Sequence, residues 1–118
     1  MRLSTAIRIG SLTTKQITGT AADGNGGYCA LGAALSAVNI EPGFYTWGDQ
    51  IRDAFPIAMT TVVHPLSGDR EPKFLIDVIW SLNDYWEWTR ESIADFVEMV
   101  EIKEEASFLT TRETALHE

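Results

Sequence analysis

The best single candidate for a nucleophile in this sequence is Cys29, the only cysteine among 118 residues. It follows a glycine-rich stretch and precedes an alanine-rich one, so we expect it at the start of a helix. There the helix dipole would lower the pKa of the thiol and raise the fraction of thiolate. A cysteine-dependent enzyme would also need a base and an orienting group, which His64 and Asn83 or Asp84 would supply. The alternative is that Cys29 is a small buried apolar side chain, as most free cysteines are.

Carboxylates form the second group of interest. They recur at three- and four-residue spacing, which places them on or beside one helical face: Glu91, Asp95, Glu98 and Glu101, with Glu104 and Glu105 beyond. Sites for Mg²⁺ or Ca²⁺ need oxygens from loops or from several elements, so a ridge on one helix does not predict a metal site. We expect no metal and no cofactor. The ridge is either a solvated face or an anionic surface that docks a basic partner.

Two tryptophans, Trp86 and Trp88, lie in the short turn before these carboxylates. A turn of this length does not easily bury both indoles, so we expect one of them to remain partly exposed. Exposed indoles are frequent in binding sites. The alternative is that both indoles cap the core between two antiparallel helices, because tryptophan is highly buried on average.

Phosphate groups are poor candidate ligands for this chain. The glycine-rich stretch at residues 23–27 precedes a predicted helix, but it lacks the Gly-Lys-Ser/Thr ending of a phosphate-binding loop. Residues 1–70 hold five basic and five acidic side chains, whereas residues 71–118 hold four basic and twelve acidic ones, which accounts for the net charge of −8. An acidic half repels nucleic acid and suits a protein partner with a basic surface.

The length and the single cysteine restrict the class of protein. A chain of 118 residues is long enough for one domain with its own core. One cysteine excludes an intrachain disulfide and a multi-cysteine zinc site, which indicates a reducing compartment. Residues 1–10 carry two arginines and no apolar run, so we expect no signal peptide. No apolar stretch approaches the roughly 20 residues of a membrane span, so we expect a cytoplasmic protein without membrane contact.

Hydrophobic periodicity predicts five helices, over residues 2–12, 29–38, 49–55, 72–82 and 89–102. We expect Ser4 to cap the first helix and Gly10 to end it. Pro72 suits the first turn of the fourth. Thr89 suits the N-cap of the last helix, which has the clearest amphipathic period of the chain. Residues 57–63 form a β-like run between two prolines, with no obvious partner strand.

We therefore predict a mainly α fold, with four to five short helices in an irregular bundle and one short β or extended segment at about residues 57–63. Residues 1–105 would form a single compact domain, and residues 106–118 a tail that is disordered or a frayed helix. The helix at 29–38 is rich in small side chains, which allow close packing. We expect it to pack against the helix at 89–102 and to leave the carboxylates facing water.

Two segments resemble a family of small uncharacterised proteins of bacteria and their phages. Residues 27–35 are similar to its "CALGA" helix, and residues 82–98 to its "LND…WTRExIAdwvE" segment. Residues 3–10 are similar to the usual start of those chains, so the resemblance spans most of residues 3–102. Some relatives carry a further cysteine pair in the middle region that would suit a metal, but residues 57–65 contain no cysteine here. The resemblance implies a bacterial or phage origin and no particular activity.

Two hypotheses of function follow. The first is a non-enzymatic, small acidic binding or regulatory protein, encoded by a phage or prophage. It would act on a protein partner through an acidic C-terminal surface formed by Trp86, Trp88, Glu91, Asp95, Glu98 and Glu101. An anti-defence protein that presents carboxylates to a surface evolved for phosphates is one specific form. The alternative is a small cysteine-dependent hydrolase or transferase that uses Cys29, His64 and Asp84. An open cleft joining these three side chains would favour catalysis.

Overall fold

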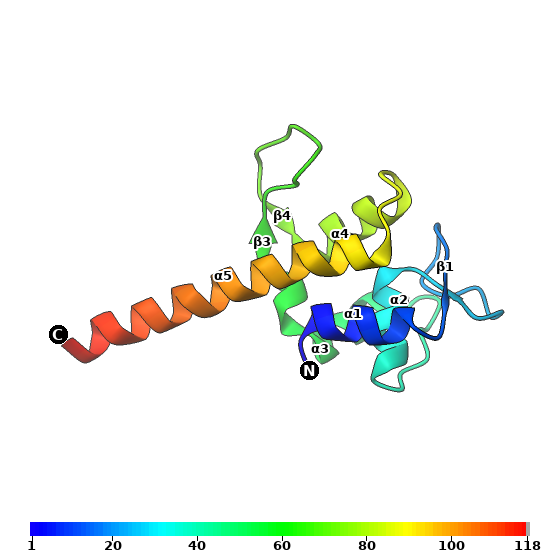
Figure 1. The fold of residues 1–118 in the computed structure, drawn as a ribbon, viewed down its shortest axis with the longest axis horizontal. Coiled ribbons are helices and arrows are strands. Elements are labelled where there is room, and N and C mark those ends of the chain that lie inside the picture. The colour runs from blue at the N-terminus through cyan, green and yellow to red at the C-terminus, as the bar shows by residue number, and fades with distance from the viewer. Residues whose placement is uncertain (118) are drawn as a thin grey trace.

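The computed structural model describes residues 1–117, with side chains described for residues 1–109, and within that range it is mainly α, as predicted (Figure 1). Its elements in chain order are α1 (Leu3–Ser11), β1 (Lys15–Gln16), β2 (Gly27–Tyr28), α2 (Ala30–Ala37), α3 (Trp47–Ala54), the 3₁₀ helix η1 (Pro56–Met59), β3 (Thr61–Val62), β4 (Lys73–Phe74), α4 (Leu75–Asp84) and α5 (Arg90–His117). The strands form two separate pairs: β1 is parallel to β2, and β3 is antiparallel to β4.

Helix α1 is the centre of the packing, because it contacts both α2 and α5 extensively (Figure 1). The backbones of α1 and α2 touch at Gly10, where an added Cβ would lie 1.8 Å from the carbonyl oxygen of Ala33. The helices predicted at 29–38 and 89–102 do share one hydrophobic core, but α1, not α5, is the helix that packs most closely on α2. Helix α1 takes the place of α5 against α2, since a glycine on one helix and alanines on the other allow this close approach.

The small residues of α2 do lie in the core, because Ala30 through Leu35 are all buried. Around them pack buried side chains of the other helices, namely Leu3, Ile7, Ile51, Leu75, Val78, Ile79, Leu82, Ile93 and Val97. The loop between β1 and β2 covers the start of α2, where an added Cβ on Gly32 would lie 2.0 Å from the carbonyl oxygen of Ala21. Helix α2 is thus enclosed on several sides.

The helix ends differ in part from the prediction. Helix α1 begins at Leu3 after an extended Arg2, so Ser4 lies inside the helix and does not cap it. Gly10 also lies inside α1, where it permits contact with α2. The cap of α5 is confirmed, because the Thr89 hydroxyl oxygen accepts a hydrogen bond of 3.1 Å from the backbone N–H of Ser92.

The predicted extended segment at residues 57–63 divides into the end of η1 and strand β3. Strand β3 does have a partner, because Thr61 pairs with Phe74 and Val62 with Lys73 in β4. Helix α4 begins at Leu75, so the prediction that Pro72 stands in its first turn is wrong. The loop between β3 and β4 projects from the helices as an arm (Figure 1).

Helix α5 continues through the predicted boundary at residue 105 and reaches His117. Its first half packs against α1 and α4, and its second half extends away from the other elements (Figure 1). Helices in proteins gain most of their stability from tertiary packing of an apolar face. Of the side chains described in this second half, Phe108 and Leu109 are more than half exposed, so these two receive little such packing. Among the described helices, none is both long and apolar enough to cross a membrane.

Candidate functional site

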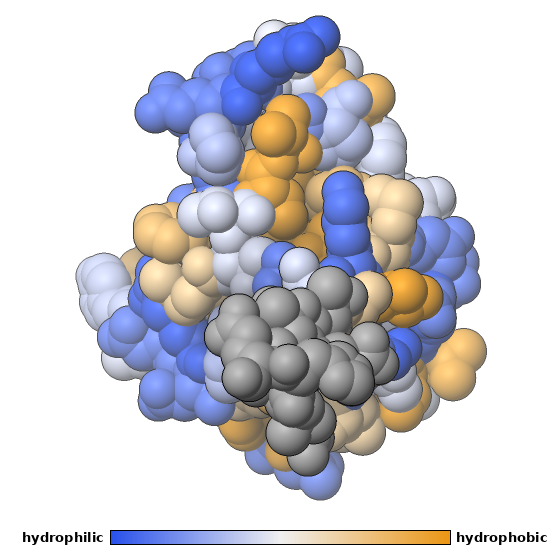
Figure 2. Space-filling model, turned by 90° about the vertical axis from the view of Figure 1, so that its left-hand side faces the viewer, coloured by the Kyte–Doolittle hydropathy of each residue, from blue (hydrophilic) through white to orange (hydrophobic). Residues whose placement is uncertain are grey.

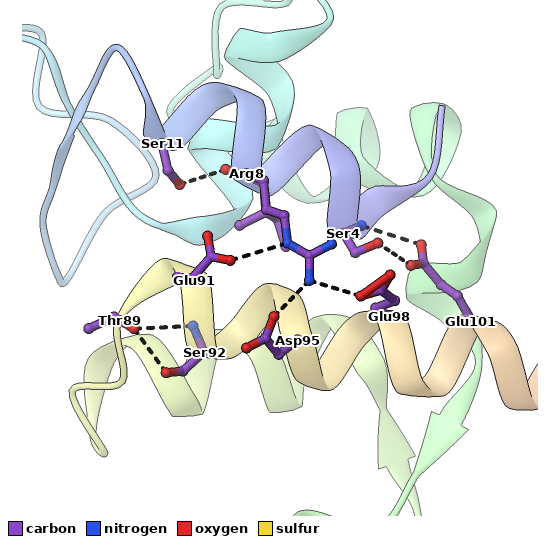
Figure 3. A network of polar contacts seen from close by, with 10 residues as sticks. Ser4, Arg8, Ser11, Thr89, Glu91, Ser92, Asp95, Glu98 and Glu101 are labelled. Carbon is purple, nitrogen blue, oxygen red and sulfur yellow. Dashed lines mark hydrogen bonds and ion pairs between the residues drawn. The ribbon is translucent and has the colours of Figure 1, made fainter.

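Three of the four predicted acidic residues of α5 converge on one cation of α1. The Arg8 guanidinium lies 2.7 Å from Asp95 and 2.9 Å from Glu98, and its Nε lies 3.4 Å from Glu91 (Figure 3). Hydrogen bonds to Asp95 and then to Glu98 raise the pKa of Arg8 above its ordinary value. The carboxylates therefore line the seam between α1 and α5, so the expectation that they face only water is wrong.

Glu101 departs furthest from the predicted surface. It is only 4% exposed, and its carboxylate accepts hydrogen bonds from the hydroxyl and the backbone N–H of Ser4 (Figure 3). One turn further along α5, Glu105 forms an exposed ion pair of 2.6 Å with Arg2. The successive pairs show that α1 and α5 run antiparallel. Glu101 thus joins the two helices and is not free to meet a partner.

The seam nevertheless keeps a negative charge that solvent can reach. Three carboxylates share the single guanidinium of Arg8, which neutralises only one of them. The side chains of Glu91 and Asp95 are each about two-thirds exposed. Ion pairs this exposed are weak, so both carboxylates can exchange Arg8 for another cation at little cost.

The same face of α5 becomes apolar where the helix leaves the domain. In a regular helix, residues 91, 95, 98, 102, 106 and 109 follow one another at spacings of three and four, so they lie in one row. Ile102 and Leu109 in this row, and Met99 beside it, are more than half exposed. We call this row, together with Met99, the α5 face. It carries carboxylates on its first half and apolar side chains on its second.

A groove of about 730 Å³ opens between α5 and the β3 strand, and its lining includes Val63, Met99 and Ile102. Figure 2 shows hydrophobic surface running down from the arm that joins β3 and β4 towards the projecting helix. Val63 is half exposed in this groove. The apolar part of the α5 face is therefore continuous with apolar surface on a second element.

The tryptophan turn follows α4. Trp86 is exposed and its ring centroid lies 6.0 Å from that of His64, whereas Trp88 is half-buried against the core. Asn83, named from the sequence as a possible orienting group for Cys29, is a buried connector: its Oδ1 accepts from Gln16 and from the backbone N–H of Ala30. Its Nδ2 donates to the backbone carbonyl of residue 17. This turn is therefore anchored to the β1–β2 loop.

Arg90 is a structural residue that the sequence analysis missed. It is 7% exposed, and its guanidinium donates to the Thr14 hydroxyl and to the backbone carbonyls of Ser11, Thr14 and Tyr28. No carboxylate pairs with it among the residues described. A cation in the first turn of a helix opposes the helix dipole, and this unusual placement is the signal that could have identified it.

Cys29 lies at the N-cap of α2, where its Sγ accepts from the backbone N–H of Gly32 at 3.4 Å. The side chain is buried, and burial raises the pKa of the thiol to about 11. The predicted lowering of this pKa is therefore wrong, because desolvation of the thiolate outweighs the amides of the helix N-terminus. A buried thiol with this pKa is not an activated nucleophile.

The other two residues of the catalytic alternative are occupied elsewhere. The His64 ring accepts from the backbone N–H groups of Leu66 and Ser67 through Nδ1, and its Nε2 lies 3.1 Å from the Ser81 hydroxyl. Asp84 accepts from the backbone N–H of Gly19 and from Asn83. Within the described part of the chain, neither residue is hydrogen-bonded to Cys29. The side chains described also include no group of three acidic, histidine or cysteine residues that could hold a metal ion.

Comparisons of the chain with protein-family models, with curated proteins and with solved structures found no match. The resemblance of residues 3–102 to small bacterial and phage proteins stays a prediction.

Proposed function

We propose that the protein is a non-enzymatic binding protein, and that the α5 face docks a partner protein with a basic surface. The observation that carries this proposal is the row on α5 that changes from carboxylates to exposed apolar side chains where the helix leaves the domain. A partner that covers the row would bury Met99, Ile102 and Leu109, and packing of an apolar face is the main source of stability for a helix.

The apolar half of the row provides the affinity in this proposal. Met99, Ile102 and Leu109 are each more than half exposed, and burying the rest of their surface would contribute on the order of 3 kcal/mol in total. A central apolar cluster of this kind is what a binding hot spot requires. The adjoining groove beside Val63 would accept further apolar side chains of the partner.

The acidic half of the row, together with the net charge of −8, selects the partner. Glu91 and Asp95 can exchange their shared cation Arg8 for a basic side chain, and the overall negative field speeds the encounter with a positive surface. A second copy of this chain carries the same negative charge, so self-association is disfavoured. The partner is therefore expected to be a different protein.

The proposal is tested by capture from a bacterial lysate followed by reconstitution with the purified partner. We expect wild-type binding to weaken as salt is raised, and Ile102→Asp to weaken it at least tenfold. Leu12→Asp is the matched control, because it makes the same change at an apolar side chain that is 84% exposed outside α5. Equal affinity of wild type and Ile102→Asp, or equal loss in the control, would contradict the proposal.

Phage or prophage origin, a cytoplasmic location and the anti-defence role are narrower proposals that rest on the sequence. If the partner uses its basic surface for nucleic acid, a DNA or RNA oligonucleotide should compete with this protein for it. Absence of competition would remove the anti-defence version and leave the binding role intact. The cysteine-dependent alternative has no support from the buried, protonated thiol of Cys29.

A further inference from the structure

An aromatic pocket lies between α3 and α4, and none of its lining residues belongs to the α5 face. Its volume is about 410 Å³, and its lining includes Trp47 of α3 and Trp80 of α4. The two indoles stack with ring centroids 5.0 Å apart and an interplanar angle of 17°. Both indoles are only partly buried, so each keeps surface available to a ligand.

The loop before α3 adds two exposed aromatic side chains beside this pocket. Tyr45 lines the pocket and is 91% exposed, and Phe44, which is 77% exposed, contacts it edge-on at 4.6 Å between centroids. Tyrosine and tryptophan are enriched in protein interfaces, where they bury large area at low cost in conformational entropy. Four aromatic side chains at one place therefore indicate a surface that contacts another molecule.

The charges around the pocket favour a cation. Arg52 is paired with Asp49 at 2.9 Å, so these two lining residues neutralise each other. Asp77 also lines the pocket and has no hydrogen-bond or ion-pair partner among the side chains described. The pocket thus combines π faces with one uncompensated carboxylate, which disfavours phosphate or carboxylate ligands and favours an organic cation.

We propose that this pocket binds an arginine side chain presented by a protein partner. A planar guanidinium can stack on an indole face and donate two parallel hydrogen bonds to the Asp77 carboxylate, which neither a lysine ammonium nor a quaternary ammonium can do. This site is independent of the α5 face, since the two share no residue. The proposal for the α5 face and the proposal for this pocket can therefore be tested, and refuted, independently.

The test is an NMR titration of the four tryptophan indole N–H signals in the intact chain, assigned with single Trp→Phe variants. The probe is N-acetyl-arginine amide, and the comparison probes are N-acetyl-lysine amide and choline. We expect saturable shifts of the Trp47 and Trp80 signals with the arginine probe, with a dissociation constant on the order of millimolar, and smaller effects on Trp86 and Trp88. Lack of saturable shifts at Trp47 and Trp80, or equal binding of all three probes, would overturn the proposal.

Substitutions at two exposed residues, Asp77 and Tyr45, establish which side chains contact the probe. Asp77→Asn should weaken binding of the arginine probe by roughly three- to tenfold, and Tyr45→Ala should weaken it about threefold. Asp53→Asn is the matched control, because it removes the same charge from an exposed site on α3 that does not line the pocket. If Asp53→Asn weakens binding as much as Asp77→Asn does, the probe senses only the overall charge and the proposed site is wrong. Asp77 also lies in the first turn of α4, so each variant is titrated well below its melting temperature.

Discussion

Replacing Gly10 with alanine tests the close contact of α1 with α2. The new Cβ would lie 1.8 Å from the carbonyl oxygen, 2.5 Å from the carbonyl carbon and 2.9 Å from the Cα of Ala33. All three atoms belong to the backbone of a buried helix, so no side chain can rotate away. Restoring an ordinary contact requires the two helices to separate by on the order of 1.5 Å, and overpacking of this kind typically costs about 1–3 kcal/mol.

Helix propensity acts in the opposite direction, because alanine is favoured over glycine by up to about 1 kcal/mol inside a helix. Because the Cβ is fixed to one helix backbone and the atoms that it meets belong to the other, the clash cannot be relieved by a side-chain rotation. Its cost therefore lies at or above the upper end of the overpacking range of about 1–3 kcal/mol. We therefore expect Gly10→Ala to lower the free energy of unfolding by about 2 kcal/mol, which corresponds to a fall in Tm of roughly 8–10 °C for a chain of this size.

The matched control is Gly48→Ala in α3, where the nearest atom to the added Cβ is the flexible tip of Arg52 at 3.4 Å. This variant should be as stable as the wild type or slightly more stable, because it gains helix propensity without a backbone clash. Urea and thermal unfolding followed by circular dichroism measure both variants. If Gly10→Ala proves as stable as Gly48→Ala, the two helices do not touch as described.

Three further predictions concern polar groups that are wholly or partly buried. Arg90→Met should lower the free energy of unfolding, measured by urea titration, by about 2–4 kcal/mol, because several backbone carbonyls lose their hydrogen-bond donor. The control Arg70→Met, at an exposed arginine, should change it by less than about 0.5 kcal/mol. Burial lowers the pKa of His64, so just below pH 6.5 the unfolded state binds more protons than the folded state does. The free energy of unfolding should therefore fall as the pH is lowered below 6.5. The variant His64→Ala should lose this part of the pH dependence. Cys29 should react with a disulfide reagent at neutral pH only as fast as the chain unfolds, since burial raises its pKa to about 11, and rapid reaction of the folded chain would show that the thiol is accessible.

The helices of this fold were predictable because their signals are local. Ile93, Val97 and Val100 repeat at helical spacing and are buried, and Thr89 caps α5 as its side-chain chemistry predicts. The end of that helix was less predictable. Periodicity weakens after residue 102, and Phe108 and Leu109 are exposed there, yet the backbone remains helical to His117.

Which helices pack against each other was not predictable, because this packing depends on residues far apart in the sequence. The spacing of Glu91, Asp95 and Glu98 places them on one face, but nothing local indicates that Arg8 lies opposite. Ser4 has the side chain of an N-cap, and only the position of Glu101 explains its burial inside α1. Strands of two residues are likewise too short to produce the alternation by which strands are recognised.

The candidate site was predicted in part. The carboxylates of α5 were named from the sequence, but Met99 and Ile102 were not singled out within the predicted helix, and Leu109 was assigned to a tail that is disordered or a frayed helix. The aromatic pocket escaped notice because Trp47 and Trp80 lie 33 positions apart and meet only through the packing of α3 near α4. For Cys29, the helix N-terminus and burial act on the pKa in opposite directions, and only the structure shows that burial prevails.

Hydrogen–deuterium exchange of the chain, alone and with its captured partner, tests the central proposal most directly. Alone, the backbone amides of residues 102–109 should exchange quickly, because Ile102, Phe108 and Leu109 are more than half exposed, whereas the amides of buried α2 should exchange slowly. With the partner bound, the amides of residues 98–109 should become protected, whereas those of the β1–β2 loop, which does not line the groove, should change little. Protection confined to other elements, with residues 98–109 still exchanging quickly, would contradict the assignment of α5 as the docking helix.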